Sequence, residues 1–220
     1  MVEFIKRFIT ASILGAVFWY TFFYMPSIAF TLLLLGILLT ILLFEWKNLF
    51  HMSDFWFWFI MPWYPILPFV LMMIMNNNEG YRCLLYYMFV LVFAFDGTAY
   101  LTGTLLGSHK IIPTISPGKT VEGCIGGFIG ALLTFWIALK ADRLHIPFLF
   151  FFSLTLITCF LAFAGDIFES FLKRSAKIKD SGTILPGHGG FLDRFDAVIF
   201  TTFFFFFFRH ALTQYLCPGI

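Results

Sequence analysis

The sequence predicts an all-α, polytopic integral membrane protein, with about seven transmembrane helices and a polar cavity that faces the cytoplasm. Of its 220 residues, 60% are hydrophobic and 12% are charged, roughly half the charge of a soluble domain. Mean hydropathy is +0.91. Apolar stretches of about 20 residues recur along the chain, and each is long enough to cross the hydrocarbon core of a bilayer.

Seven apolar segments are expected to span the membrane, at roughly 7–24, 27–44, 55–75, 83–106, 121–140, 146–172 and 196–216. The first is interpreted as a retained helix and not as a signal peptide. Met25-Pro26-Ser27 separates the first two, which predicts a tight hairpin or a break in one long apolar run. The third contains three prolines, so we expect it to be kinked or partly re-entrant. No soluble domain or internal repeat is found, so residues 1–220 are expected to form a single membrane domain.

Basic residues are distributed unevenly between the connections. With the N-terminus inside, ten of the 14 Lys and Arg residues fall in inside segments and three in outside segments. The positive-inside rule then places loops 107–120 and 173–195 together on the cytoplasmic side. The formal net charge of +2 says little about partners, and no nucleic acid is expected.

Two residue types are interpreted as packing elements. The four isolated cysteines, Cys83, Cys124, Cys159 and Cys217, lie in or beside apolar stretches, so no disulfide framework is expected. Three glycine pairs recur at helical spacing, at 103 and 107, 123 and 127, and 126 and 130. Such pairs fit a homodimer face or close helix packing within one subunit, and we favour packing.

Ionisable side chains at membrane depth are costly, so each one indicates a functional site. Asp96 lies deep in an apolar helix. Asp166 and Glu169 are three residues apart near the end of another helix, and Asp193 and Asp196 repeat that spacing where the last helix begins. Residues three apart share a helical face, so each pair is expected to point in one direction.

One loop, 173–195, joins these two acidic helix ends and adds several cations and a Gly-rich turn. Carboxylates beside many cations are typical of a site where Mg²⁺ and basic side chains bind phosphates. Glycines allow backbone N–H groups to approach an anion. A solvated loop whose charges anchor helix ends is the alternative interpretation.

The stretch from Ser170 to Asp196 reads SFLKRSAKIKDSGTILPGHGGFLDRFD. It resembles the signature of the phosphatidate cytidylyltransferase (CDP-diacylglycerol synthase) family, and every fixed position of that pattern is met. DGTAYLTG (residues 96–103) and ISPGKTVEG (residues 115–123) resemble two further segments of the family. The resemblance covers roughly residues 90–200, the expected catalytic core, whereas residues 1–80 match only as apolar helices.

The resemblance implies transfer of the cytidylyl group of CTP to phosphatidic acid, giving CDP-diacylglycerol and pyrophosphate for phospholipid biosynthesis. It implies Mg²⁺, with a monovalent cation such as K⁺ beside it, and the metal ligands Asp166, Asp193 and Asp196. For Asp196, a helix N-terminal charge partnering Arg194 is the alternative. Catalytic roles are expected for Asp166 and Asp193, and also, on the basis of their charge, for Lys173 and Arg174. Substrate binding is expected for Lys119, Ser116, Thr120, Asp96, Tyr100, Lys179, His188 and Arg194.

Several of these roles have equal alternatives. Ser116 and Thr120 suit helix capping as well as phosphate binding, and Asp96 with Tyr100 suits pairing across helices. For His188 a turn or hydrogen-bonding role is preferred. A CTP transferase with a different lipid phosphate acceptor is the close alternative function, and a membrane transporter is a remote one. We expect an inner-membrane enzyme in the lipid bilayer, with its site facing the cytoplasm; a homodimer is compatible with the sequence.

Overall fold

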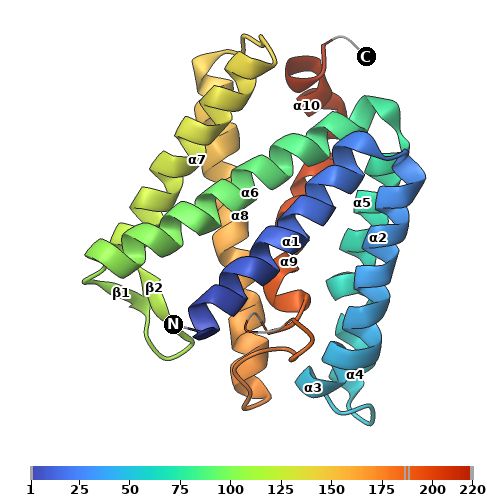
Figure 1. The fold of residues 1–220 in the computed structure, drawn as a ribbon, viewed down its shortest axis with the longest axis vertical. Coiled ribbons are helices and arrows are strands. Elements are labelled where there is room, and N and C mark those ends of the chain that lie inside the picture. Colours follow the sequence, from blue (N-terminus) through green and yellow to red (C-terminus); the bar gives the residue numbers. More distant parts are fainter. Residues whose placement is uncertain (1, 186, 188, 219–220) are drawn as a thin grey trace.

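The computed structural model describes the chain except for residues 1, 186, 188 and 219–220 and the side chains of residues 2–9 and 11. Long helices dominate it (Figure 1), which confirms the all-α prediction. Its α-helices are α1 (Val2–Tyr24), α2 (Ser27–Thr40), α3 (Trp46–Leu49), α4 (Phe55–Ile60), α5 (Leu67–Asn77), α6 (Glu79–Leu106), α7 (Val121–Ala141), α8 (Phe148–Ser175), α9 (Leu192–Phe207) and α10 (Arg209–Leu216). Two π-helical turns, η1 (Ile41–Glu45) and η2 (Pro62–Ile66), interrupt the series. The strands β1 (Lys110–Ile112) and β2 (Ser116–Thr120) form one antiparallel hairpin.

Membrane-spanning length is reached by five helical segments of the described chain, or by six if the bent pair α9 and α10 counts as one. The segments are Ser27–Leu49, Phe55–Asn77, Glu79–Leu106, Val121–Ala141 and Phe148–Ser175. The described apolar part of α1, Ser12–Tyr24, is shorter. The polytopic membrane fold therefore follows from the helices, while the count of seven stays a prediction.

Two of the predicted spans are not straight, and another contains a π-helical turn. The Pro-rich third span is broken at Tyr64, which has non-helical backbone angles between Pro62 and Pro65, so the predicted kink is confirmed. The second span continues from α2 through η1 into α3. The last span bends by 88° between α9 and α10, a break that the uniform run of phenylalanines in the sequence conceals.

Glycines allow α6 and α7 to approach closely. A Cβ added at Gly126 would lie 2.3 Å from the Thr102 hydroxyl oxygen, and one added at Gly130 would lie 2.2 Å from that of Thr98. A Cβ at Gly123 would lie 3.2 Å from the Cα of Gly103 on the facing helix. The predicted role of these glycines in packing within one subunit is confirmed.

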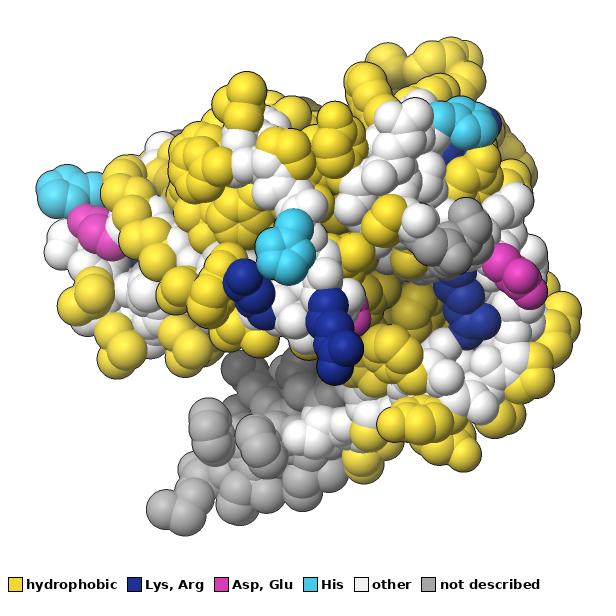
Figure 2. All heavy atoms as spheres, turned by 90° about the horizontal axis from the view of Figure 1, so that it is seen from above, with side chains coloured by type: hydrophobic (Ala, Val, Ile, Leu, Met, Phe, Trp, Pro, Cys, Tyr) yellow, Lys and Arg dark blue, Asp and Glu magenta, His cyan; other side chains and the backbone are white. Residues whose placement is uncertain are grey.

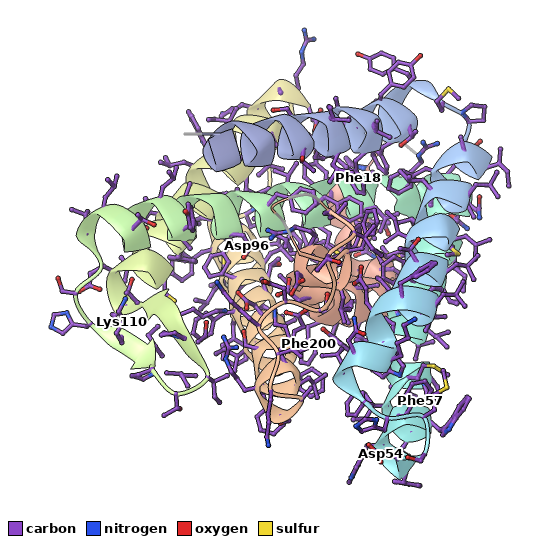
Figure 3. The ribbon with its side chains drawn as sticks, turned by 60° about the horizontal axis from the view of Figure 1, so that its bottom comes forward. Phe18, Asp54, Phe57, Asp96, Lys110 and Phe200 are labelled. Atoms are coloured by element: carbon purple, nitrogen blue, oxygen red, sulfur yellow. A yellow bond between two sulfur atoms is a disulfide. The ribbon has the colours of Figure 1, made fainter. Side chains whose placement is uncertain are left out.

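Aromatic side chains fill the core where the N-terminal helices meet α6 and α9. The ring of Phe18 on α1 packs against Phe30 on α2, Phe89 on α6 and Phe195 on α9. Figure 3 shows Phe18 between α1 and α6. Hydrophobic side chains also cover much of the outer surface, as the view of the end that carries α10 shows (Figure 2), and a bilayer solvates such a surface.

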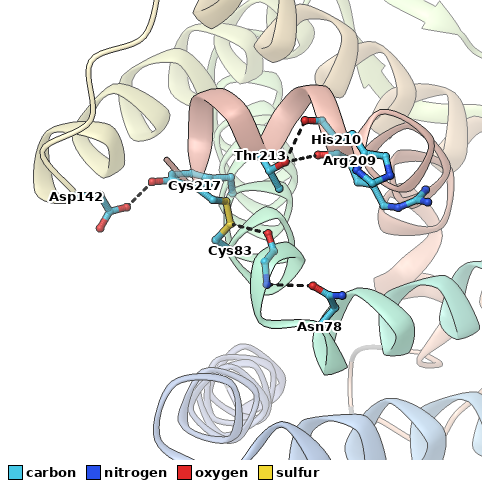
Figure 4. The surroundings of a disulfide bond; sticks show 9 residues. Asn78, Cys83, Asp142, Arg209, His210, Thr213 and Cys217 are labelled. Atoms are coloured by element: carbon cyan, nitrogen blue, oxygen red, sulfur yellow. Dashed lines mark hydrogen bonds between the residues drawn. A yellow bond between two sulfur atoms is a disulfide. The ribbon is translucent and has the colours of Figure 1, made fainter. Parts of the chain in front are cut away.

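Cys83, near the start of α6, and Cys217, directly after α10, form a disulfide (Figure 4). The prediction that all four cysteines are unpaired packing residues is therefore wrong for these two. The pair is separated by 134 residues in sequence, and α10 is brought to the start of α6 by the bend that follows α9. Cys124 and Cys159 are free.

Candidate active site

Nine of the predicted site residues line one cavity of about 570 Å³. Its walls come from α6, the β1–β2 hairpin, the first turn of α7, the inner part of α8 and the start of α9. Those nine residues are Asp96, Tyr100, Ser116, Lys119, Thr120, Asp166, Asp193, Arg194 and Asp196. The two polar loops that sequence analysis placed on one side therefore meet at one site.

Helix packing brings the cavity walls together. Asp96 lies on α6 near the middle of the helices in Figure 3, whereas Lys110 lies on the hairpin at the edge of the bundle. Thr120 ends β2, and its hydroxyl oxygen accepts a hydrogen bond from Gly123 N at 3.1 Å. Thr120 thus caps α7, the alternative role kept open for it, and fixes the hairpin against the cavity.

An ion pair joins the hairpin to α8. Lys119 Nζ lies 2.7 Å from Asp166 Oδ2, and the other oxygen of Asp166 accepts from the Ser170 hydroxyl at 3.3 Å. Lys119 also lies over the ring of Phe163. A lysine ammonium on a flexible stem can exchange one anionic partner for another, so Lys119 is suited to transfer from Asp166 to a phosphate.

Asp193 is the most heavily bonded carboxylate of the site. Its Oδ1 accepts from Lys173 Nζ at 2.6 Å. Its Oδ2 accepts from the backbone N–H groups of Ser181 at 2.9 Å and Gly190 at 2.8 Å. Lys173 also pairs with the fully buried Glu169. The Gly-rich segment therefore directs the N–H group of Gly190 at the protein's own carboxylate, and not at an external anion.

Two glycines create the space for this arrangement. Gly189 has a φ of +79°, and a Cβ there would lie 2.5 Å from Asp193 Oδ2. A Cβ at Gly190 would lie 2.3 Å from the Ser181 hydroxyl oxygen and 2.5 Å from the carboxyl carbon of Glu45. The glycines of the signature are thus explained by close approach of side chains.

Three predicted site residues lie outside the cavity wall. Lys173 is held between Glu169 and Asp193. Arg174 donates to the backbone oxygens of Ile115 at 3.2 Å and Ile178 at 2.9 Å, so it ties the hairpin to the segment after α8. Lys179 is exposed. The position of His188 lies outside the described residues.

Sequence reasoning missed Glu45 and Lys110. Lys110 lines the cavity from β1. Glu45 has no solvent exposure, and its two oxygens accept from Phe191 N at 2.7 Å and Leu192 N at 2.8 Å. Sequence analysis ended the second apolar span at residue 44, so Glu45 fell in the connection that follows. The signal that could have identified it is a carboxylate directly after an unbroken apolar run.

The carboxylate oxygens of the cavity are of the ligand type that a divalent cation such as Mg²⁺ prefers. Four aspartates line the cavity wall, and Mg²⁺ is usually held by one or two carboxylates together with substrate phosphates. Within the described part of the chain, no three acidic, His or Cys side chains form a ready-made metal site. Asp193 is the least available of the predicted ligands because its two oxygens accept four hydrogen bonds, from the Lys173 ammonium, the Ser181 hydroxyl and the backbone N–H groups of Ser181 and Gly190.

A second cavity of about 410 Å³ adjoins the first. Asp96, Asp193, Arg194 and Asp196 line both cavities. The rest of the second wall is largely apolar and comes mainly from α1, α2, α6 and α9, with Leu14, Val17, Phe18, Trp19, Leu33, Ile37, Phe93 and Phe195. A polar chamber and an apolar chamber therefore share one charged wall.

Comparison with known proteins gives one family match over most of the chain and several similar relatives. The model of the Cytidylyltransferase family matches residues 3–212. Phosphatidate cytidylyltransferase of Bacillus subtilis (strain 168) is 42% identical over 127 residues, which are 58% of this chain and 47% of the relative. The enzyme of that name from Staphylococcus aureus (strain COL) is 42% identical over 125 residues, 57% of this chain and 48% of the relative. The chain spans about half the length of the curated relatives it matches.

Proposed function

The chain belongs to the Cytidylyltransferase family, and from that premise we propose that it transfers the cytidylyl group of CTP to phosphatidic acid. The products are CDP-diacylglycerol and pyrophosphate. Relatives 41–42% identical to this chain bear the name phosphatidate cytidylyltransferase, which supports this substrate pair. The sequence signature from Ser170 to Asp196 supports the same reaction.

The observation that carries the proposal is the pair of adjoining cavities. A nucleoside triphosphate needs a polar, cationic chamber, and the first cavity is lined by the cations Lys110, Lys119 and Arg194. A phospholipid needs an apolar space beside its headgroup, and the second cavity supplies it. The shared wall would then hold the phosphate of the lipid beside the α-phosphate of CTP.

In the proposed reaction, a phosphate oxygen of phosphatidic acid attacks the α-phosphorus of CTP. The bond from that phosphorus to the oxygen bridging to the β-phosphate breaks, and pyrophosphate leaves with the bonding electrons. Lys119 would exchange Asp166 for a phosphate oxygen and offset charge that develops on the leaving group. Lys173, between Glu169 and Asp193, would keep Asp193 in place beside the reacting phosphates.

We propose Asp166 and Asp196, with Asp193, as the residues that would hold Mg²⁺. When bound, the cation would neutralise phosphate charge during transfer. The carboxylates that line one polar cavity support this assignment. A second cation such as K⁺ and a homodimer stay predictions.

We further propose that the protein lies in an inner membrane and that its polar cavity opens to the cytoplasm, as expected for an enzyme that uses CTP. The bias of Lys and Arg toward the connections at this end supports the orientation. The disulfide at the start of α6, away from the hairpin (Figure 1), supports it too, because disulfides persist in oxidising compartments.

The test is conversion of CTP labelled at the α-phosphate by the detergent-purified protein with phosphatidic acid. We expect a labelled, chloroform-soluble product with Mg²⁺, none with EDTA, and none from Asp166→Asn. Folded protein that yields no lipid product from several phosphatidic acids would overturn the proposed acceptor. If a different lipid phosphate is supplied as the acceptor and becomes labelled, it would be identified as the alternative acceptor.

A further inference from the structure

Glu45 is a buried carboxylate outside both cavity walls, and it bonds to a segment almost 150 residues away. It ends the π-helical turn η1, which adds a residue to the turn and rotates the following side chains relative to a regular helix. Its side chain has no solvent exposure. A buried carboxylate is costly unless hydrogen bonds to it compensate, so the contacts of Glu45 are the reason it is tolerated.

These contacts converge on the start of α9. Glu45 Oε1 accepts from Phe191 N at 2.7 Å, and Oε2 accepts from Leu192 N at 2.8 Å. Phe191 and Leu192 precede Asp193 directly, and their N–H groups belong to the positive end of the α9 dipole. A carboxylate at this position both fills the unpaired donors of the helix and interacts favourably with the dipole.

A serine connects Glu45 to Asp193. The Ser181 hydroxyl lies 3.1 Å from Glu45 Oε2 and 2.9 Å from Asp193 Oδ2, and it donates to one of them at a time. The backbone carbonyl oxygen of Ser181 accepts from the side-chain amide of Asn48, one turn after Glu45, at 2.8 Å. Glu45 and Asn48 therefore bond to Ser181, whose backbone N–H and hydroxyl bond to Asp193, and Glu45 also bonds to the residues directly before Asp193.

We propose that Glu45 is a positioning residue for the active site: by fixing the first turn of α9, it sets Asp193, Arg194 and Asp196 in the wall shared by the two cavities. This inference rests on the proposed transferase function, because it assigns the contacts of Glu45 a role in that reaction. It also gives the N-terminal apolar region a direct part in the site, beyond anchoring the protein in the membrane.

The test compares Glu45→Gln with Glu79→Gln, the same chemical change at an exposed position in the first turn of α6. We expect Glu45→Gln to lower kcat about tenfold to hundredfold and to raise the KM for CTP severalfold. Loss of folded protein alone would lower the apparent kcat without changing KM. Backbone amide exchange across residues 189–194 should accelerate in Glu45→Gln and not in Glu79→Gln.

A second variant keeps the Glu45 residue but forces its side chain to move. In Gly190→Ala the new Cβ would lie 2.5 Å from the carboxyl carbon of Glu45, so the carboxylate must move. We expect the same rise in KM and in local exchange as in Glu45→Gln. If both variants keep wild-type kcat, KM and exchange, the positioning role is overturned. A wild-type protein without transferase activity would overturn the proposed function instead, while the exchange measurement would still show whether Glu45 fixes the first turn of α9.

Discussion

The ammonium group of Lys173 on α8 lies 2.6 Å from Oδ1 of Asp193 on α9. The same nitrogen pairs with Glu169, one helical turn earlier on α8. All three side chains are largely or fully buried. One lysine therefore offsets the charge of two carboxylates. Because Lys173 lies on α8 and Asp193 on α9, the same ion pair both stabilises the contact between these helices and positions Asp193 in the site.

Replacing Lys173 by Met should be strongly destabilising, because it leaves two carboxylates buried without their cation. Breaking a buried ion pair from one side costs about 3–5 kcal/mol. Thermal unfolding in detergent would measure the loss. The double variant Lys173→Met with Glu169→Gln should recover part of it, since one uncompensated charge is then absent. A wild-type melting temperature in the single variant would contradict the assignment.

The Lys119–Asp166 pair predicts a different kind of defect. Lys119→Gln removes a cation that lies on the cavity wall, so we expect a higher KM for CTP and a lower kcat, together about tenfold to hundredfold in kcat/KM. Lys140→Gln, in the last turn of α7, is the matched control and should behave as wild type. Equal kinetics for the two variants would remove Lys119 from the phosphate site.

The glycine face between α6 and α7 predicts opposite outcomes for one substitution at two helical glycines. Gly126→Ala places a Cβ 2.3 Å from the Thr102 hydroxyl oxygen, and such overpacking costs about 1–3 kcal/mol. Gly36→Ala on α2 meets nothing within 4 Å, so it should be neutral or stabilising by about 0.5–1 kcal/mol. Melting temperatures that rank the other way would contradict the observed helix contact.

The disulfide predicts redox-dependent stability. With Cys83 and Cys217 paired, alkylation of the denatured, unreduced protein should modify Cys124 and Cys159 alone, and mass spectrometry would count the modified thiols. The double variant Cys83→Ser with Cys217→Ser should unfold more easily by about 2–4 kcal/mol. Four modified cysteines without reductant would contradict the pairing.

Much of the fold could be predicted because lipid imposes simple constraints. Apolar length located the spans, and the prolines at 62 and 65 located the break in the third. The bend after Phe207 and the Cys83–Cys217 pair could not be predicted in this way. Both depend on contacts between distant segments, and neither changes the local hydrophobic pattern.

The site shows the same division. Asp96, Asp166 and Asp193 were identified because charge at membrane depth requires an explanation, and all three line the cavity. Arg174 was predicted to be catalytic from its charge, yet it bonds to backbone oxygens of two loops. Glu45 was missed because its partners lie at residues 181–192. Charge alone does not reveal which ionised groups the protein uses to hold itself together.

The two adjoining cavities predict that the substrates can be disturbed separately. Gly15 on α1 lines the apolar cavity, and a Cβ there meets nothing within 4 Å, so Gly15→Leu should fill that space without straining the backbone. Because the lipid is proposed to occupy this cavity, we expect the KM for long-chain phosphatidic acid to rise severalfold while the KM for CTP stays unchanged. Gly36→Leu, exposed on α2 and absent from both cavity walls, should leave both constants unchanged. A rise in the KM for CTP with Gly15→Leu would mean that the nucleotide, and not the lipid, uses the apolar chamber.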